Sequence, residues 1–351
     1  MRERSLHALL SLSFIVGMVS LAAPLPASAS SGCAAITFEQ TYTPECDAEM
    51  LANPEPNVLP LEPDRRAIAQ YTFMRLNHGE EGDQPVLVYD MPGGKAVRAI
   101  DPGFNFVTVR EQIDGWVEIN EGEWIREGDV LTQRASSFAG VQVVEPLAYP
   151  LAWILINTYT AEYPGGPQII DPARLHRRYE RINIYATVNI DGHNWYLIAP
   201  GEWVYHTWVA IARPVPRPEG VSGRWIAVDL CEQTLAAFED DRMVFATLIS
   251  SGLPQWGTRE GLFRIWARLW HDHMSGAEGA PDFYSLENVP YVMYFDGGIS
   301  LHGTYWHDGF GYRRSHGCVN LSITDARWLF EWTNVEGFRE APVYVFASGQ
   351  Y

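Results

Sequence analysis

The chain has 351 residues, a formal net charge of −18 and an aromatic content of 13%, with 13 Trp and 17 Tyr. This length is enough for two or three domains, each with its own hydrophobic core. The negative net charge repels the phosphate backbone of nucleic acids, so nucleic acid is not an expected partner. Aromatic rings pack well on pleated strands, so the composition favours a mainly β protein.

The N-terminus has the parts of a secretory signal peptide. Arg2 and Arg4 precede an apolar run over 9–23, and Ala-Ser-Ala at 27–29 matches the small-x-small pattern of a cleavage site. The apolar run is shorter than the roughly 20 residues that a membrane-spanning helix needs. We therefore interpret 1–29 as a cleaved signal peptide rather than an anchor, and we predict an exported protein.

Four cysteines divide into one close pair and two separate thiols. Cys33 and Cys46 lie in the Pro-rich segment 30–65, which we interpret as a linker or arm because prolines disfavour long helices and central strands. Outside the cell this pair forms either a local disulfide or two unpaired thiols, and the spacing leaves both alternatives open. Cys231 ends an apolar run and is expected to be a buried, inert thiol. Cys318 has a different setting, described below.

An internal repeat follows the Pro-rich segment. The stretch 113–125 is echoed by 190–204, and Asp-Gly in both copies is the turn signal of an antiparallel hairpin. Around each copy, apolar and polar residues alternate in short runs, as in half-buried strands. We predict two small β-barrels, 66–135 and 145–213, which resemble bacterial SH3-like modules. One larger irregular β-domain is the alternative.

Each copy of the repeat places one tryptophan shortly after its Asp-Gly turn. These are Trp116 and Trp195, and each lies on a strand that alternates with apolar residues. The alternation favours packing in the core. The alternative is a stacking surface for glycans, which would make the modules binding units.

The last domain is predicted to be mainly β with one helix. Three prolines in 214–220 mark a second linker, so this domain spans 221–351. A helix is predicted over 323–332, because Ser322 and Asp325 form the pattern of a capping box. Strands are expected over 225–230, 234–239, 243–250, 262–269, 291–295, 299–302 and 343–346.

One segment of this domain carries nucleophilic chemistry. His302 ends a predicted strand, and Cys318 closes a Ser-His-Gly-Cys run at 315–318. A thiol with a reference pKa of about 8.5 needs a neighbouring base or cation to act as a nucleophile at neutral pH. We expect His302 to accept the thiol proton, with the carbonyl of Gly303 holding its other ring nitrogen. Gly317 allows a tight turn that directs its own amide and that of Cys318 towards an oxyanion.

These residues resemble the signature of the L,D-transpeptidases of the YkuD family. The resemblance covers the last domain and includes Ile-Ala-Val-Asp-Leu at 226–230, the Gly-Thr turn at 257–258 and the stretch 289–295 before the histidine strand. Two positions vary in the family. Arg259 stands where many members have proline, and Asn320 stands where the family has either Arg or Asn.

The resemblance implies a β-sandwich-like catalytic domain that acts on peptidoglycan stem peptides, with a role in cell-wall organisation and cell shape. Cys318 would carry the acyl group released from D-Ala, and His302 would be the general base, with Gly317 and Cys318 as oxyanion donors. Transfer to an amine of a second stem would form a 3→3 cross-link in the cell wall or periplasm. Carbapenems would inhibit the enzyme. Four further positions map onto the motif as loop-supporting or substrate-contacting residues: Gly303, Ser315, His316 and Asn320.

Several alternatives are weighed against this interpretation. Water in place of the amine acceptor would give an L,D-carboxypeptidase from the same acyl-enzyme. In papain-like peptidases the cysteine precedes its histidine, which is the reverse of the order here. His271 and His273 share a strand face, but no second cysteine or carboxylate completes a tetrahedral set, so we expect no metal and no cofactor. A non-catalytic wall-binding protein is disfavoured because both catalytic motifs are intact.

Overall fold

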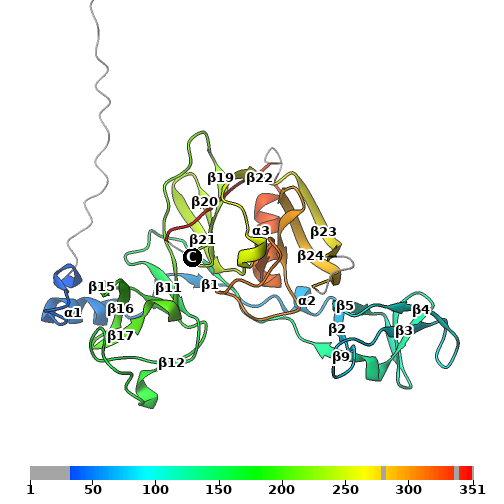
Figure 1. The fold of residues 1–351 in the computed structure, drawn as a ribbon. Coiled ribbons are helices and arrows are strands. Elements are labelled where there is room, and N and C mark those ends of the chain that lie inside the picture. Colours follow the sequence, from blue (N-terminus) through cyan, green and yellow to red (C-terminus); the bar gives the residue numbers. More distant parts are fainter. Residues whose placement is uncertain (1–31, 278–281, 336–339, 350–351) are drawn as a thin grey trace, which may run out of the picture.

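The structure is a computed structural model that describes residues 32–277, 282–335 and 340–349. The predicted signal peptide, 1–29, lies outside the described residues. Figure 1 shows a central body of strands that contains helix α3, and smaller β modules on either side of it. Within the described ranges, no helix is long and apolar enough to cross a membrane.

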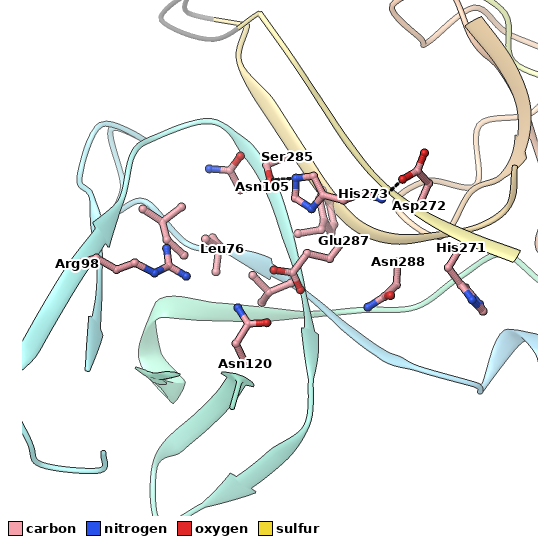
Figure 2. A pocket seen from close by; sticks show the side chains of 13 residues that line it. Leu76, Arg98, Asn105, Asn120, His271, Asp272, His273, Ser285, Glu287 and Asn288 are labelled. Carbon is pink, nitrogen blue, oxygen red and sulfur yellow. Dashed lines mark hydrogen bonds between the residues drawn. The ribbon is translucent and has the colours of Figure 1, made fainter. Parts of the chain in front are cut away.

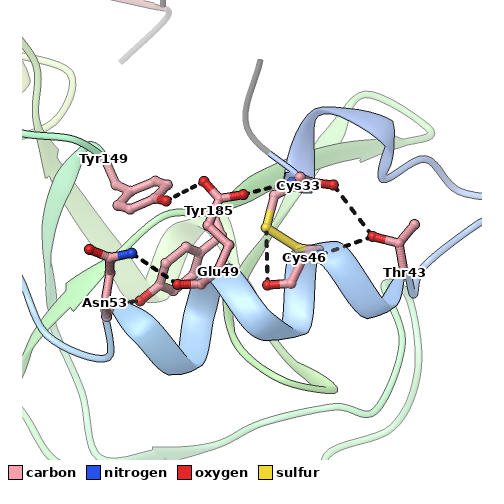
Figure 3. The surroundings of a disulfide bond; sticks show 8 residues. Cys33, Thr43, Cys46, Glu49, Asn53, Tyr149 and Tyr185 are labelled. Carbon is pink, nitrogen blue, oxygen red and sulfur yellow. Dashed lines mark hydrogen bonds between the residues drawn. A yellow bond between two sulfur atoms is a disulfide. The ribbon is translucent and has the colours of Figure 1, made fainter. Parts of the chain in front are cut away.

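The described part of the Pro-rich segment, residues 32–65, is folded. Its elements are η1 (Gly32–Ala35), α1 (Pro44–Ala52) and β1 (Leu59–Pro60), and α2 (Arg65–Ile68) follows directly. Figure 3 shows a disulfide between Cys33 and Cys46, so the first of the two alternatives holds. The hydroxyl of Tyr149 donates to Glu49 and that of Tyr185 to the carbonyl of Asn53, so α1 is held against the second module.

A seven-stranded sheet, sheet A, forms one layer of the central body. Its order is β1-β10-β21-β20-β19-β27-β22. The bounds are β10 (Val141–Gln142), β19 (Arg224–Asp229), β20 (Thr234–Glu239), β21 (Arg242–Leu248), β22 (Gly261–Arg264) and β27 (Pro342–Phe346). Two of these strands, β1 and β10, precede residue 214, so the N-terminal segments extend the sheet of the last domain. Cys231, which follows β19, is half-buried rather than buried.

A second sheet, sheet B, is shared between the last domain and the first module. Its order is β26-β25-β24-β5-β2-β9, and β23 also pairs with β24. The bounds are β2 (Thr72–Leu76), β5 (Phe104–Val109), β9 (Val130–Gln133), β23 (Ala267–Gly276), β24 (Tyr284–Asp296), β25 (Ile299–Gly303) and β26 (Val319–Leu321). The parallel pairing of β24 with β5 joins the two parts.

The rest of the first module forms a separate five-stranded sheet. Its order is β4-β3-β8-β7-β6, and its elements are β3 (Val86–Tyr89), β4 (Ala96–Ile100), β6 (Glu111–Ile113), β7 (Trp116–Asn120), β8 (Glu123–Arg126) and η2 (Glu127–Asp129). The predicted barrel over 66–135 is thus not seen as a closed sheet in the described residues. Its strands are divided between this sheet and sheet B, so part of the module shares a sheet with the last domain.

The second module consists of three small open sheets, so a closed barrel over 145–213 is not seen in the described residues either. Its elements are β11 (Leu151–Ile154), β12 (Thr158–Tyr159), η3 (Pro172–Arg174), β13 (Leu175–His176), β14 (Arg181–Asn183), β15 (Ala186–Ile190), β16 (His193–Ala199), β17 (Glu202–Tyr205), η4 (His206–Trp208) and β18 (Val209–Ala212). Side chains of β11 and β18 share a hydrophobic cluster with sheet A. The module therefore packs on the last domain. The SH3-like character of both modules stays a prediction.

The repeated Asp-Gly pairs form the predicted hairpin turns. Asp114 and Gly115 have φ of 44° and 80°, and Asp191 and Gly192 have φ of 50° and 86°. Positive φ at both central residues is the requirement of a type I′ turn, which Asp-Gly meets at low cost. The turns join β6 to β7 and β15 to β16.

Helix α3 (Ile323–Thr333) confirms the predicted helix and its cap. The hydroxyl of Ser322 accepts a hydrogen bond from the amide of Asp325 at 3.1 Å. The buried carboxylate of Asp325 accepts from the amide of Gly140 at 2.8 Å and from the hydroxyl of Thr247 at 2.6 Å. Burial raises the pKa of Asp325 to about 6. One side chain thus connects α3 to β21 and to the segment before β10.

The two repeat tryptophans, predicted to pack in the core, are partly buried, and Trp195 packs against a hydrophobic core cluster of the second module. Trp116 packs edge-on against Tyr89 at a ring distance of 4.9 Å, and Trp195 packs edge-on against Tyr205 at 5.3 Å. The fully buried tryptophan of the second repeat copy is Trp203, which is 0% exposed. It lies on β17, where the sequence pattern gave no reason to prefer it.

Replacing these two tryptophans of the second module should separate their contributions to stability. We expect Trp203→Ala to lower the free energy of unfolding by about 3–5 kcal/mol, because it leaves a large cavity in the core. The matched change Trp195→Ala should cost clearly less. Urea titration followed by far-UV circular dichroism measures both. Equal losses would contradict the assignment of Trp203 as the core residue.

Candidate active site

His302 and Cys318 come from two neighbouring parallel strands. His302 lies in β25, Cys318 directly precedes β26, and the register of the two strands places His302 opposite Asn320. The sulfur of Cys318 lies 3.7 Å from the hydroxyl of Ser300 and 3.9 Å from the carbonyl of Gly298. The strand pairing thus brings the predicted nucleophile and base to one place.

A pocket of about 220 Å³ surrounds this place. Five of the residues predicted from the sequence line it: His302, Ser315, His316, Cys318 and Asn320. Six others were not predicted: Phe104, Met274, Tyr284, Leu286, Trp306 and Arg314. Most of the second group come from β5, β23 and β24 and are apolar, so the pocket has an apolar side that the catalytic motif does not reveal. Alternation along β24 was the available sequence signal for Tyr284 and Leu286.

The imidazole of His302 is buried and held by its neighbour. Its Nδ1 lies 3.1 Å from the carbonyl oxygen of Gly303, as the sequence led us to expect. A carbonyl can only accept, so Nδ1 carries the hydrogen and Nε2 is left as the basic nitrogen. No hydrogen bond joins His302 to Cys318 in the described part of the chain.

Burial favours the neutral forms of both the resting thiol and the imidazole. Burial lowers the pKa of His302 to about 4, against a smaller opposite effect of the Gly303 carbonyl. Burial raises the pKa of the Cys318 thiol above its usual value, and hydrogen bonds from Ser300 only partly oppose this. Both shifts disfavour charge separation. The structure therefore differs from the ion pair that would stabilise a thiolate before substrate arrives.

The Ser-His-Gly-Cys loop is fixed by hydrogen bonds at Gly317. Its φ is 118°, and a Cβ there would lie 2.7 Å from Ile299, so only glycine fits without strain. The Gly317 carbonyl accepts from the hydroxyl of Thr258 at 2.7 Å. The Gly317 amide donates to the hydroxyl of Ser315 at 3.1 Å. An oxyanion can use this predicted donor only if it displaces the Ser315 hydroxyl, so the oxyanion role of Gly317 stays a prediction.

His316 is held between aromatic rings. Its ring centroid lies 3.9 Å from that of Trp256, in η5 (Pro254–Trp256), and 5.0 Å from that of Tyr284. Burial lowers the pKa of His316, although Asp282, with 3.8 Å between Nε2 and the carboxylate, raises it. These contacts give His316 a part in the pocket wall.

Asn320 supports the loop that joins His302 to Cys318. Its side-chain amide lies 2.9 Å from Nε2 of His307, and Nδ1 of His307 accepts from the amide of Gly309 at 3.0 Å. The ring hydrogen is therefore on Nε2, and the oxygen of the Asn320 amide is the atom that can accept it. Burial lowers the pKa of His307 to about 3, so this ring is neutral. The backbone of Asn320 also exchanges two hydrogen bonds with Ser250. Asn320 therefore fixes the strand that carries the cysteine.

A second, polar cleft lies where the first module meets β23 and β24. It measures about 560 Å³, and Figure 2 shows Arg98, Asn120 and Glu287 around it. His271 and His273 line this cleft, and Nε2 of His273 lies 3.2 Å from the hydroxyl of Ser285. No three His, Cys, Asp or Glu side chains gather as metal ligands within 32–277, 282–335 and 340–349.

The last domain matches a known enzyme family. Residues 223–345 match the YkuD family, described as the L,D-transpeptidase catalytic domain. This range contains His302, Cys318 and the loop between them. The match thus supports an L,D-transpeptidase catalytic domain at residues 223–345.

Individual relatives carry the same description. A Bacillus subtilis (strain 168) protein, the putative L,D-transpeptidase YciB, is 28% identical over 115 residues, which are 30% of this chain and 59% of that protein. The catalytic domain of an Enterococcus faecium L,D-transpeptidase is 28% identical, with 36% of this chain and 99% of that chain covered and a TM-score of 0.31. An L,D-transpeptidase from Mycobacterium smegmatis is 18% identical, with 60% of this chain and 90% of that chain covered and a TM-score of 0.33. The chain thus spans less than two thirds of the curated relative, 59% of its length.

The neutral resting pair predicts how Cys318 reacts with a small alkylating agent. Because burial raises the thiol pKa, the rate of reaction with iodoacetamide should still be rising above about pH 9, where an ordinary thiol is largely ionised. The measurement uses a Cys231→Ser variant, in which Cys318 is the one cysteine outside the disulfide. A rate that is already level near neutral pH would contradict the neutral pair and indicate a preformed thiolate.

Proposed function

We propose that this protein is a peptidoglycan L,D-transpeptidase that forms 3→3 cross-links through an acyl-enzyme on Cys318. The observation that carries the proposal is the placement of His302 on β25 and of Cys318 directly before the adjacent parallel strand β26, within one pocket. The match of residues 223–345 to the L,D-transpeptidase family supports the substrate class.

The neutral pair leads to a definite order of proton transfers. The sulfur of Cys318 attacks the carbonyl carbon of the third stem residue while its proton passes to Nε2 of His302. The bond to the nitrogen of D-Ala then breaks, and His302 returns the proton to that leaving amine. A thioester remains on Cys318. An amine of a second stem attacks the thioester and loses a proton to His302, which then reprotonates the departing thiolate.

The acceptor in the second step decides the product. Water would release a free stem, whereas an amine gives the cross-link. The apolar side of the pocket, which includes Met274, Leu286 and Trp306, favours exclusion of water from the thioester. This supports the transferase over the carboxypeptidase.

The proposal extends to where the enzyme acts and to its inhibitors. We propose export to the cell wall or periplasm, and the disulfide between Cys33 and Cys46 supports an oxidising compartment. Acylation of Cys318 by carbapenems would follow from the same attack on a carbonyl. Glycan binding by the modules stays a prediction, and the half-exposed Trp195 beside Tyr205 is the surface that would carry it.

Substitution at the two catalytic positions tests the assignment of roles. Cys318→Ala should abolish turnover and adduct formation with a carbapenem while leaving the melting curve unchanged, because little volume is lost. His302→Ala should lower the acylation rate by about two or more decades, the scale of a positioned general base. Mass spectrometry of the intact protein over time measures both.

His316→Ala is the matched control for the loss of a histidine from the same pocket. Its acylation rate should fall less than that of His302→Ala, because His316 packs between rings. Equal losses at the two positions would overturn the division of roles. Cross-linking that survives Cys318→Ala would overturn the nucleophile.

The product distribution tests the acceptor. With a defined disaccharide tetrapeptide as both donor and acceptor, we expect dimers joined between two third residues, identified by tandem mass spectrometry. Monomers that carry a tripeptide as the main product would instead identify a carboxypeptidase. The Cys318→Ala variant should give neither product.

A further inference from the structure

We propose that Phe104, a residue of the first module, contacts the donor stem in the catalytic pocket and helps to determine which stems the enzyme accepts. The proposal rests on the proposed function for the identity of the substrate. The position of Phe104 in the pocket wall rests on geometry alone. The first module would then be part of the active site rather than a spacer or a separate binding unit.

Phe104 is placed at the pocket by backbone pairing. It begins β5, lies opposite Tyr284 in the parallel pairing with β24, and donates from its amide to the carbonyl of Phe283 at 2.9 Å. Further along the contact between β5 and β24, the amide of Thr108 donates to the carboxylate of Glu287 at 2.8 Å. Hydrogen bonds at both ends of the contact between β5 and β24 fix the position of Phe104 relative to Cys318.

The two faces of the paired strands β5 and β24 have different surroundings. Side chains alternate along a strand, so Tyr284 and Leu286 face the cysteine pocket while Ser285 and Glu287 face the polar cleft. Figure 2 shows Ser285 and Glu287 on the cleft side. Phe104 lines the cysteine pocket together with Tyr284, which lies opposite it in the strand pairing.

The ring of Phe104 is both accessible and held in place. It is 38% exposed, so a ligand in the pocket can reach it. The ring packs edge-on against Phe106 at 4.9 Å, and the guanidinium of Arg75 lies 5.5 Å from its centroid. These neighbours restrict its motion, so little conformational entropy is lost when a ligand binds.

The chemistry of the wall indicates what it contacts. Phe104, Met274 and Leu286 together form an apolar surface that lines the same pocket as the thiol of Cys318. Charged or strongly hydrated groups gain nothing there. The matching part of a stem peptide is the hydrocarbon portion of a side chain or backbone next to the scissile bond.

The first module also holds the residues that follow His302. The ring of Tyr305 stacks on that of Phe73 at 3.6 Å, and the side chain of Gln133 donates to the carbonyl of Tyr305 at 2.9 Å. The hydroxyl of Tyr305 donates to the carbonyl of Glu287 at 2.7 Å. The wall formed by Phe104 and the loop that begins after His302 are therefore positioned by the same module.

The test compares Phe104→Ala with Val97→Ala in the full chain. Val97 is an exposed apolar residue of the same module and does not line the pocket. We expect Phe104→Ala to raise KM for a tetrapeptide donor by about ten-fold, as loss of a partly buried aromatic contact does, with kcat nearly unchanged. Val97→Ala should leave both constants at their wild-type values. Phe104→Leu, which keeps an apolar side chain, should have a smaller effect and serves if the Ala variant does not fold.

A second measurement needs no stem peptide. In the Cys231→Ser background, the rates of reaction of Cys318 with iodoacetamide and with fluorescein maleimide are compared. Removal of the Phe104 ring widens the pocket, so the ratio of the maleimide rate to the iodoacetamide rate should rise several-fold. An unchanged ratio would overturn the place of Phe104 in the pocket wall.

The two measurements separate this proposal from the proposed function. If the wild type turns over no stem peptide, the proposed function fails while the alkylation ratio still decides whether Phe104 forms the wall. If stem peptides are turned over and the ratio changes but KM does not, Phe104 lines the pocket without contacting the donor, and the inference about substrate selection is wrong.

Discussion

Strand β24 is the constraint on which the rest of the arrangement depends. One part of it pairs with β25, which carries His302, and its first residues pair with β5 of the first module. Along much of its length it also pairs with β23. Backbone hydrogen bonds fix the register of all three neighbours. One strand therefore sets the relative positions of the base, the apolar wall of the pocket and the first module.

The loop between His302 and Cys318 is held from two sides. From the first module, Phe73 stacks on Tyr305. From the second module, the hydroxyl of Tyr179 donates to the carbonyl of Asp308 at 2.7 Å. Such a loop loses little further freedom on binding substrate, which favours catalysis by a preorganised site. Both modules thus act on the catalytic geometry through direct contacts.

The sequence predicted the local features of this molecule and missed the long-range ones. The Asp-Gly turns and the cap of α3 are set by residues a few positions apart, and the residue types of His302 and Cys318 indicate their chemistry without a fold. The pairing of β5 with β24 joins segments about 180 residues apart, and local alternation does not encode such a partner. For the same reason the closed barrel predicted for 66–135 is not seen in the described residues, because β2, β5 and β9 belong to sheet B. Trp203 was missed because burial on β17 depends on what packs against that strand.

The sharing of sheets between segments affects how the molecule can be divided. The family match begins at residue 223, yet β1 and β10, which complete sheet A, lie before it. A fragment cut at that boundary would expose the unpaired edge of β21 and leave the start of β24 without β5. Strand edges without a hydrogen-bonded neighbour pair with strands of other chains and promote aggregation. We therefore expect the unit that folds stably in recombinant expression to be larger than residues 223–345.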